Sequence, residues 1–228
     1  RRRRAAQQQG ASVNIPGAEG GNPTLMAFGG PRRRRNRQRG ALGNIGNGGR
    51  ITLSRCELYA QASVAVNAST LFSDIPIFPP AATGNTFPFL QNLARVYTRL
   101  RWERMVFEWR PAVGTTTNGI LTYGVRLMDD STTPPTSRIQ ISALSPVNDH
   151  PVWQASDMVV PSELLQSRKW YAVQRSGTGV SNPDLVDLGP GSLQYGLNVD
   201  TVKDTARMFG EFWISYTVTL DGCRSGNA

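Results

Sequence analysis

Histidine, cysteine and lysine are scarce in this chain of 228 residues. It has one histidine, His150, two cysteines, Cys56 and Cys223, and two lysines, Lys169 and Lys203. A single histidine excludes metal sites built on a histidine pair, and two cysteines are too few for a disulfide scaffold or a four-thiolate zinc site. No apolar run approaches the roughly 18 residues of a membrane span. The arginine-rich start also lacks the apolar stretch of a signal peptide.

Acidic residues are nearly absent from the first 50 residues, which hold 11 arginines and one acid, Glu19. Residues 51–228 hold 14 basic residues against 15 acids, so the formal charge of +9 comes from the N-terminal segment. That segment also holds 11 of the 23 glycines and no Trp or Tyr, so it buries too little apolar surface to offset its ordering entropy. We expect a flexible, partly disordered basic arm over residues 1–49 and a folded domain over residues 50–228.

Two arginine blocks make the arm a polycation. The guanidinium group binds phosphate in a bidentate manner and stays charged near neutral pH. No aromatic residue is interleaved, which argues against base stacking and sequence readout. Non-specific RNA binding is therefore the favoured function of this arm, with a nuclear-localisation signal or a merely solvated tail as the alternatives. The predicted RNA-binding residues are Arg1, Arg2, Arg3, Arg4, Arg32, Arg33, Arg34, Arg35, Arg37 and Arg39.

The remainder of the chain has the alternating pattern of β-strands. Alternation is clearest over residues 211–220, where Phe212, Ile214, Tyr216 and Val218 share the face expected to point inward and Trp213 lies on the other. Similar patterns cover residues 104–110, 119–127 and 193–199, and weaker ones cover 51–60, 64–68, 152–159 and 169–174. Short helices are predicted near 89–97, 138–144 and 161–165. Seven or eight strands with Pro- and Gly-rich connections predict an all-β, two-sheet antiparallel sandwich of jelly-roll or immunoglobulin-like topology.

Three features outside the arm are candidate sites. His150 lies between Asp149 and Pro151, a context more typical of a turn than of a catalytic base. The two cysteines are expected to be free thiols. Adjacent carboxylates, Asp129 and Asp130, follow a strong strand; they suit calcium, although such a pair is more often a solvated turn.

The order of several segments resembles that of sobemovirus coat proteins, which form the shells of plant viruses. The segments are residues 49–58, 119–130, 139–144, 152–153, 168–171 and 210–218. The resemblance spans about residues 49–220, with an arginine-rich arm ahead of it. It implies an eight-stranded jelly roll and a T=3 icosahedral shell around single-stranded, positive-strand RNA. It also implies that part of the arm, here residues 14–26, orders into a β-annulus, although the second arginine block departs from the family pattern.

The resemblance further implies calcium between subunits. Carried over, the metal ligands are Asp129 or Asp130, the main-chain carbonyl of Tyr171, and Asn227. The family's aspartates are three residues apart, whereas these are adjacent, and neighbouring side chains on an extended chain point in opposite directions. One of the two would then face away from the metal.

These observations together favour a capsid coat protein that is not an enzyme. We expect it to assemble with copies of itself in the host cytoplasm, to be found in virions, and to bind neither a membrane nor a small-molecule substrate. The alternative from another class is a cellular jelly-roll module, lectin-like, with a basic nucleic-acid-binding tail. A sandwich-fold hydrolase is a third, and it would need a nucleophile beside His150.

Overall fold

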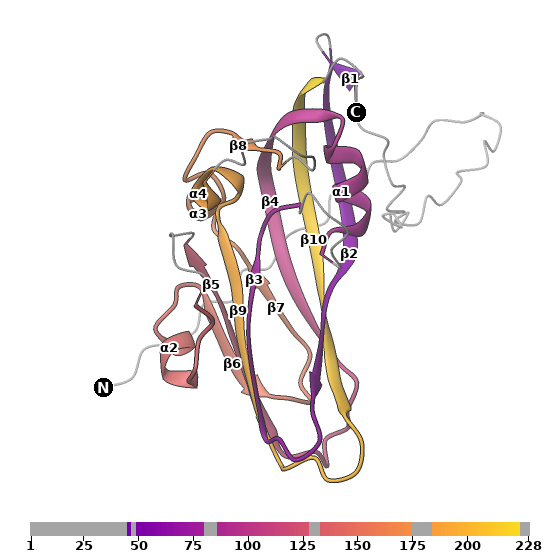
Figure 1. Cartoon of the computed structure of the whole chain (residues 1–228), viewed down its shortest axis with the longest axis vertical. Helices are drawn as coiled ribbons and strands as arrows, with labels where there is room; N and C mark the ends of the chain where they lie inside the picture. Colours follow the sequence, from indigo (N-terminus) through magenta and orange to yellow (C-terminus); the bar gives the residue numbers. More distant parts are fainter. Residues whose placement is uncertain (1–44, 47–48, 80–85, 128–132, 175–183, 224–228) are drawn as a thin grey trace, which may run out of the picture. The chain divides into compact units, whose positions relative to one another are not determined.

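The chain forms two antiparallel sheets that face each other (Figure 1). The computed structural model describes residues 45–46, 49–79, 86–127, 133–174 and 184–223. The six-stranded sheet contains β1 (Ile45–Gly46), β2 (Arg50–Val64), β10 (Arg207–Cys223), β4 (Tyr97–Pro111), β7 (Ser156–Val159) and β8 (Tyr171–Ala172), the last paired with β4. The four-stranded sheet contains β3 (Thr70–Pro76), β9 (Gly191–Val199), β5 (Gly119–Leu127) and β6 (Val147–Pro151).

The connectivity is that of a jelly roll. Without the two-residue strands β1 and β8, eight strands form two sheets in the orders β2-β10-β4-β7 and β3-β9-β5-β6. Only β5 and β6 are both consecutive and paired, and each other connection among the eight crosses between the sheets. This arrangement confirms the predicted eight-stranded jelly roll and replaces the immunoglobulin-like alternative. Strand β1 pairs with β2, so the sheet already begins within the segment predicted as arm.

Four short helices are present among the described residues. Helices α1 (Pro88–Ala94), α2 (Arg138–Ser142) and α3 (Ser162–Leu165) lie where the sequence predicts helices, whereas α4 (Leu185–Leu188) was not predicted. Within this part of the chain, none of the helices has the length and apolar character needed to cross a membrane.

The weaker strand predictions were wrong in places. Residues 65–68 form a turn after β2, with Asn67 in a left-handed conformation (φ 61°), and residues 152–155 precede a shorter strand, β7. The edge strands β3 and β6 were missed. Most of their residues are only partly buried, so they show no alternation of buried and exposed side chains.

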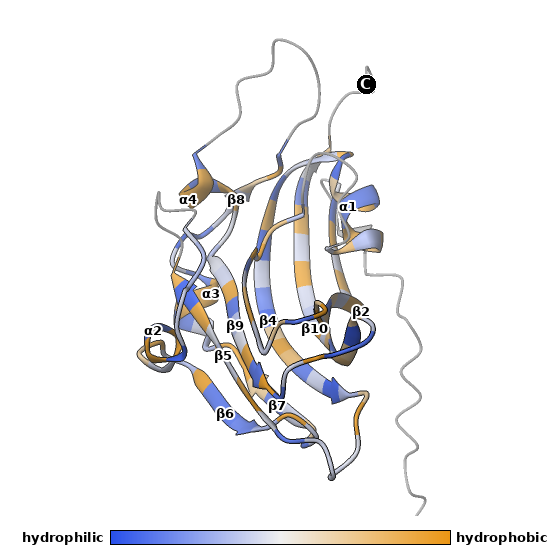
Figure 2. Ribbon diagram, turned by 60° about the horizontal axis from the view of Figure 1, so that its bottom comes forward, coloured by the Kyte–Doolittle hydropathy of each residue, from blue (hydrophilic) through white to orange (hydrophobic). Residues whose placement is uncertain are grey.

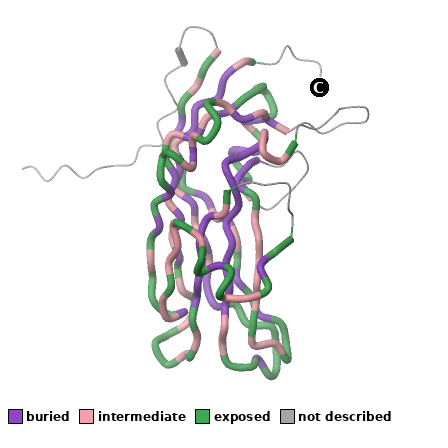
Figure 3. Tube along the Cα trace, turned by 90° about the vertical axis from the view of Figure 1, so that its left-hand side faces the viewer, coloured by how far each residue is buried: buried purple, intermediate pink, exposed green. Residues whose placement is uncertain are grey.

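The core lies between the sheets, and hydrophobic, buried positions alternate with polar or exposed ones along the long strands (Figures 2 and 3). It is rich in aromatic residues. As predicted, Phe212 and alternate residues of β10 point inward and are buried. The Phe212 ring centroid lies 4.9 Å from those of Trp109 and Tyr195, and 5.2 Å from that of Tyr123. Trp213 lies on the outer face, where the Arg110 guanidinium sits 4.3 Å from its ring centroid.

The two sheets differ in length, and this difference creates a place for α1. Strands β2, β4 and β10 have 15, 15 and 17 residues, against 7, 9 and 9 for β3, β5 and β9. At the end where β4 begins, α1 lies beside β2 and β10 (Figure 1). Its preceding residue, Phe87, is fully buried against the rings of Tyr59, Trp102 and Tyr216.

Candidate functional site

The ten predicted RNA-binding arginines lie outside the described residues, but the point where the arm joins the domain is described. Gly49 leads into β2 with φ 75° and lies against Cys223 at the end of β10, whose Sγ donates to the Gly49 carbonyl at 3.4 Å. Strand β4 begins beside it, because Tyr97 pairs with Cys223. The arm therefore enters the molecule at one end of the six-stranded sheet.

A cluster of charge and aromatic surface surrounds this entry point. Asp221 accepts hydrogen bonds from Arg50 at 3.1 Å and from Arg99 at 2.7 and 3.1 Å. The hydrogen bond from Arg50, followed by those from Arg99, outweighs the opposing effect of desolvation and lowers the pKa of Asp221. Both guanidinium groups also lie over the ring of Trp170, at 5.3 and 4.8 Å from its centroid. The Asp221 carboxylate and the Trp170 ring thus hold Arg50, the first residue of β2, beside Arg99 of β4.

Of the predicted calcium ligands, the structure describes only Tyr171; Asp129, Asp130 and Asn227 lie outside the described residues. Tyr171 lies in β8, is buried, and pairs with Leu100 of β4. The Tyr171 hydroxyl lies 2.8 Å from Ser167 Oγ. In the described part of the chain, no group of three or more His, Cys, Asp or Glu side chains is placed to hold a metal ion.

A buried carboxylate within β2 was not predicted from the sequence. Glu57 of β2 is 6% exposed and accepts hydrogen bonds from the Tyr216 hydroxyl and, at 2.7 Å, from the Phe89 backbone N–H of α1. Burial, and then the bond to Glu57 and its charge, raise the pKa of Tyr216. The signal available in the sequence was an acid at an inward position of an alternating strand.

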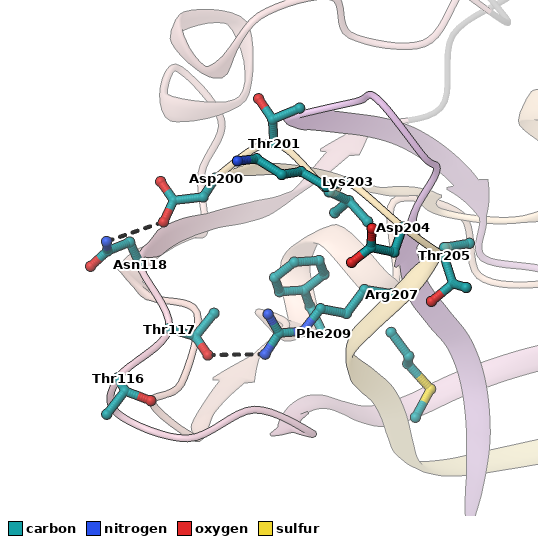
Figure 4. A pocket seen from close by; sticks show the side chains of 13 residues that line it. Thr116, Thr117, Asn118, Asp200, Thr201, Lys203, Asp204, Thr205, Arg207 and Phe209 are labelled. Carbon is teal, nitrogen blue, oxygen red and sulfur yellow. Dashed lines mark hydrogen bonds between the residues drawn. The ribbon is translucent and has the colours of Figure 1, made fainter.

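A polar cavity of about 560 Å³ lies between the loop 116–118 and the segment 200–209 (Figure 4). Within it, Asn118 donates to Asp200 at 3.1 Å and Arg207 donates to Thr117 at 3.3 Å. Its charged side chains are two acids and two bases: Asp200, Asp204, Lys203 and Arg207. With no net charge, this cavity does not favour a polyanion.

His150 has a hydroxyl group beside it. Its Nε2 lies 2.6 Å from Ser156 Oγ, the neighbour that the hydrolase alternative required. Its Nδ1, however, faces the Pro151 carbonyl at 2.8 Å rather than a carboxylate, and Ser156 also bonds Tyr123. This pair lacks the carboxylate that orients the histidine in a catalytic triad. Cys56 and Cys223 are free and exposed, as expected.

Comparison with known proteins gives a consistent result. The family model described as viral coat protein (S domain) matches residues 23–225. The capsid protein of Carnation mottle virus is 28% identical over 209 residues, covering 88% of this chain and 55% of the relative. The capsid protein of Cucumber necrosis virus is 29% identical over 135 residues, covering 59% of this chain and 32% of the relative. The chain thus spans about half the length, or less, of these curated relatives.

Solved structures share the fold at lower identity. A structure of tobacco necrosis virus superposes with a TM-score of 0.66 at 18% identity, covering 82% of this chain and 88% of that chain. A structure of Cocksfoot mottle virus gives a TM-score of 0.55 at 18% identity, covering 78% and 95%. At this identity the likeness establishes the jelly-roll fold alone.

Proposed function

The chain belongs to the viral coat protein (S domain) family, and from this premise we propose that it is the subunit of a T=3 icosahedral shell that packages single-stranded RNA. The match over residues 23–225 carries the proposal, and it favours a coat protein over the lectin-like module and the hydrolase. The family's role is structural rather than catalytic. Assembly would take place in the host cytoplasm, and the finished protein would reside in the virion.

The charge distribution supports a division of labour within the subunit. The folded part is close to neutral, so shell contacts do not have to overcome a large repulsion between copies. The ten arginines of residues 1–39 provide the positive charge that packaged phosphates require. Ten phosphate contacts on single-stranded RNA correspond to a slope of log K against log salt of about −7.

Replacing the six arginines of residues 32–39 by glutamine tests the RNA part of this proposal. The expected result is a lower RNA content, measured by ultraviolet absorbance of purified particles, and a salt slope shallower by about 4. The matched control replaces the same six by lysine, which keeps the charge and should keep the slope. Unchanged RNA content and slope in the glutamine variant would contradict the proposal.

Deleting residues 1–39 tests the arm as an assembly element. We expect a folded domain that stays unassembled or forms smaller, RNA-poor shells, because both the polycation and the predicted annulus segment, residues 14–26, are lost. Circular dichroism checks the fold, and electron microscopy checks particle size. Full-length RNA in particles of normal size would contradict this role.

We also propose calcium between subunits, held by Asp129 or Asp130, the Tyr171 carbonyl, and Asn227 of a neighbouring copy. The described segments support it: β5 ends at Leu127, two residues before Asp129, and β10 ends four residues before Asn227. In Figure 1, β10 ends toward the same end of the molecule as β8, whereas β5 ends below α3, nearer the middle. Carboxylates of one copy and neutral oxygens of another suit a cation that prefers six to eight oxygen ligands.

Sedimentation velocity with a chelator tests the calcium site. Without metal, ionised carboxylates repel each other, and protonation relieves this repulsion. Metal-free particles should therefore loosen as pH rises from about 5 to 8 and stay compact at the acidic end. Changing Asp129 and Asp130 to Asn should abolish the chelator response, whereas Asp204→Asn, in the polar cavity, should leave it intact. A sedimentation coefficient that does not change on addition of chelator across this pH range would contradict the calcium proposal.

A further inference from the structure

A chain of four hydrogen bonds runs through the chain's single histidine. Asn148 Nδ2 donates to the Tyr123 hydroxyl at 2.9 Å, and this hydroxyl lies 2.8 Å from Ser156 Oγ. Ser156 Oγ lies 2.6 Å from His150 Nε2, and His150 Nδ1 lies 2.8 Å from the Pro151 carbonyl. None of these residues belongs to the arm or to the proposed calcium ligands.

The direction of every bond in this network follows from its last member. A carbonyl can only accept, so His150 Nδ1 carries a proton and, in the neutral ring, Nε2 accepts. Ser156 therefore donates to His150 and accepts from Tyr123, which in turn accepts from Asn148. Each hydroxyl has one donor and one acceptor only while the imidazole is neutral.

The network joins the two sheets. His150 and Asn148 belong to β6 and Tyr123 to β5 of the four-stranded sheet, whereas Ser156 opens β7 of the six-stranded sheet. Next to it, the Trp109 indole N–H of β4 donates to the Val152 carbonyl at 2.9 Å, in the connection between β6 and β7. The corner at residues 152–155 is thus fixed by bonds from both sheets.

Two acids lie near the network: the charge of Asp149 acts on His150, and that of Asp157 acts on Tyr123. Asp149 is bonded by Thr122, at 2.6 Å, and by Arg138 of α2; although burial opposes it, these bonds and the nearby charges lower the pKa of Asp149. Asp157 of β7 is exposed, and its backbone carbonyl, not its carboxylate, accepts from Asn148. Burial raises the pKa of Tyr123, against the bond that it donates to Ser156 and the bond that it accepts from Asn148, so its hydroxyl stays neutral.

We infer that His150 is a proton-operated latch that holds the β6–β7 corner when neutral and releases it when protonated. A proton on Nε2 makes this nitrogen a donor, so Ser156 Oγ must accept from it and the Ser156 proton can no longer point to Nε2. Ser156 then either accepts from Tyr123 as well, which leaves the Ser156 proton without an acceptor in this network, or donates to Tyr123, which leaves the Tyr123 proton without one. A buried hydroxyl without a partner destabilises the folded state. The stabilisation is therefore present while the ring is neutral and is lost when the ring gains a proton.

Urea unfolding of the full-length chain at pH 7.5 and 5.5, with chelator present and tryptophan fluorescence as the readout, tests this latch. Loss of about one hydrogen bond corresponds to roughly a tenfold change in the unfolding equilibrium constant. Over this pH interval, we expect the unfolding equilibrium constant of the wild type to rise about tenfold more than that of His150→Gln, whose side chain cannot be protonated. Equal losses in the two proteins would overturn the inference.

Ser156→Ala is the second variant, in case His150→Gln does not fold. This variant keeps the histidine but removes the hydroxyl whose proton is displaced. Between the two pH values, its unfolding equilibrium constant should therefore also rise about tenfold less than that of the wild type. A wild-type-sized loss in Ser156→Ala would overturn the inference. Because the calcium proposal predicts loosening at alkaline pH and the latch predicts it at acidic pH, the two effects have opposite signs.

Discussion

Phe212→Ala is the sharpest test of the packing between the sheets. The side chain is fully buried and contacts the rings of Trp109, Tyr123 and Tyr195, one from the same sheet and two from the opposite one. Removal of a buried phenylalanine costs about 3–5 kcal/mol, and each lost aromatic contact accounts for about 0.5–1.5 kcal/mol beyond area burial. We expect a cost near the upper end of that range, a large part of a typical stability of about 5–15 kcal/mol.

Urea denaturation followed by circular dichroism measures this cost, and the next residue provides the control. Trp213 lies on the outer face, only partly buried, with one cation–π contact to Arg110. Trp213→Ala should therefore cost about 1 kcal/mol in the isolated subunit. A cost for Phe212→Ala no larger than that for Trp213→Ala would refute the inward register of β10.

Two further predictions concern close packing and charge. The Cβ of an alanine at Gly196 would lie 2.7 Å from the Phe72 ring and 2.9 Å from Ile141 of α2, so Gly196→Ala should cost about 1–3 kcal/mol in urea unfolding; Gly114→Ala, which meets nothing within 4 Å, should be near neutral. The lowered pKa of Asp221 means that its contribution is present above its ordinary value of 3.8 and is lost as pH falls through the lower folded value. The difference in urea midpoint between wild type and Asp221→Asn should therefore be constant above about pH 4 and shrink below it; a difference that persists in strong acid would contradict this role.

The sequence predicted strands well where one face is buried and poorly where neither is. Strand β10 pairs along its length with β2 and β4, and its inner residues are buried, so period-two alternation gave both its extent and its register. Strands β3 and β6 lie at the edges of the four-stranded sheet, and most of their residues are only partly buried. The polar composition of β6, which includes Asn148 and Asp149, was indistinguishable from that of a turn, because a strand's pattern reflects what covers it.

The candidate site, too, was only partly predictable from the sequence. Arm and domain were separable because charge and composition are properties of a segment and need no knowledge of pairing. Contacts between distant residues were not accessible: Arg50 and Asp221 are 171 positions apart, and Glu57 and Tyr216 are 159 apart. Ser156 lies only six positions from His150, yet their contact depends on the chain crossing from one sheet to the other between them.

The position of α1 shows why such contacts decide local structure. A helix of seven residues is too short to be stable by itself, and this one lacks a side-chain cap at its start. Glu57 supplies both an anchor and a cap for this helix. A buried carboxylate requires donors, and the start of α1 offers an N–H at Phe89 that has no partner within the helix. That carboxylate faces α1 only because β2 extends beyond the shorter sheet, which leaves its inner face uncovered there. The helix is therefore fixed by the difference in strand length and by one buried acid, neither of which is a property of the residues 88–94 that form it.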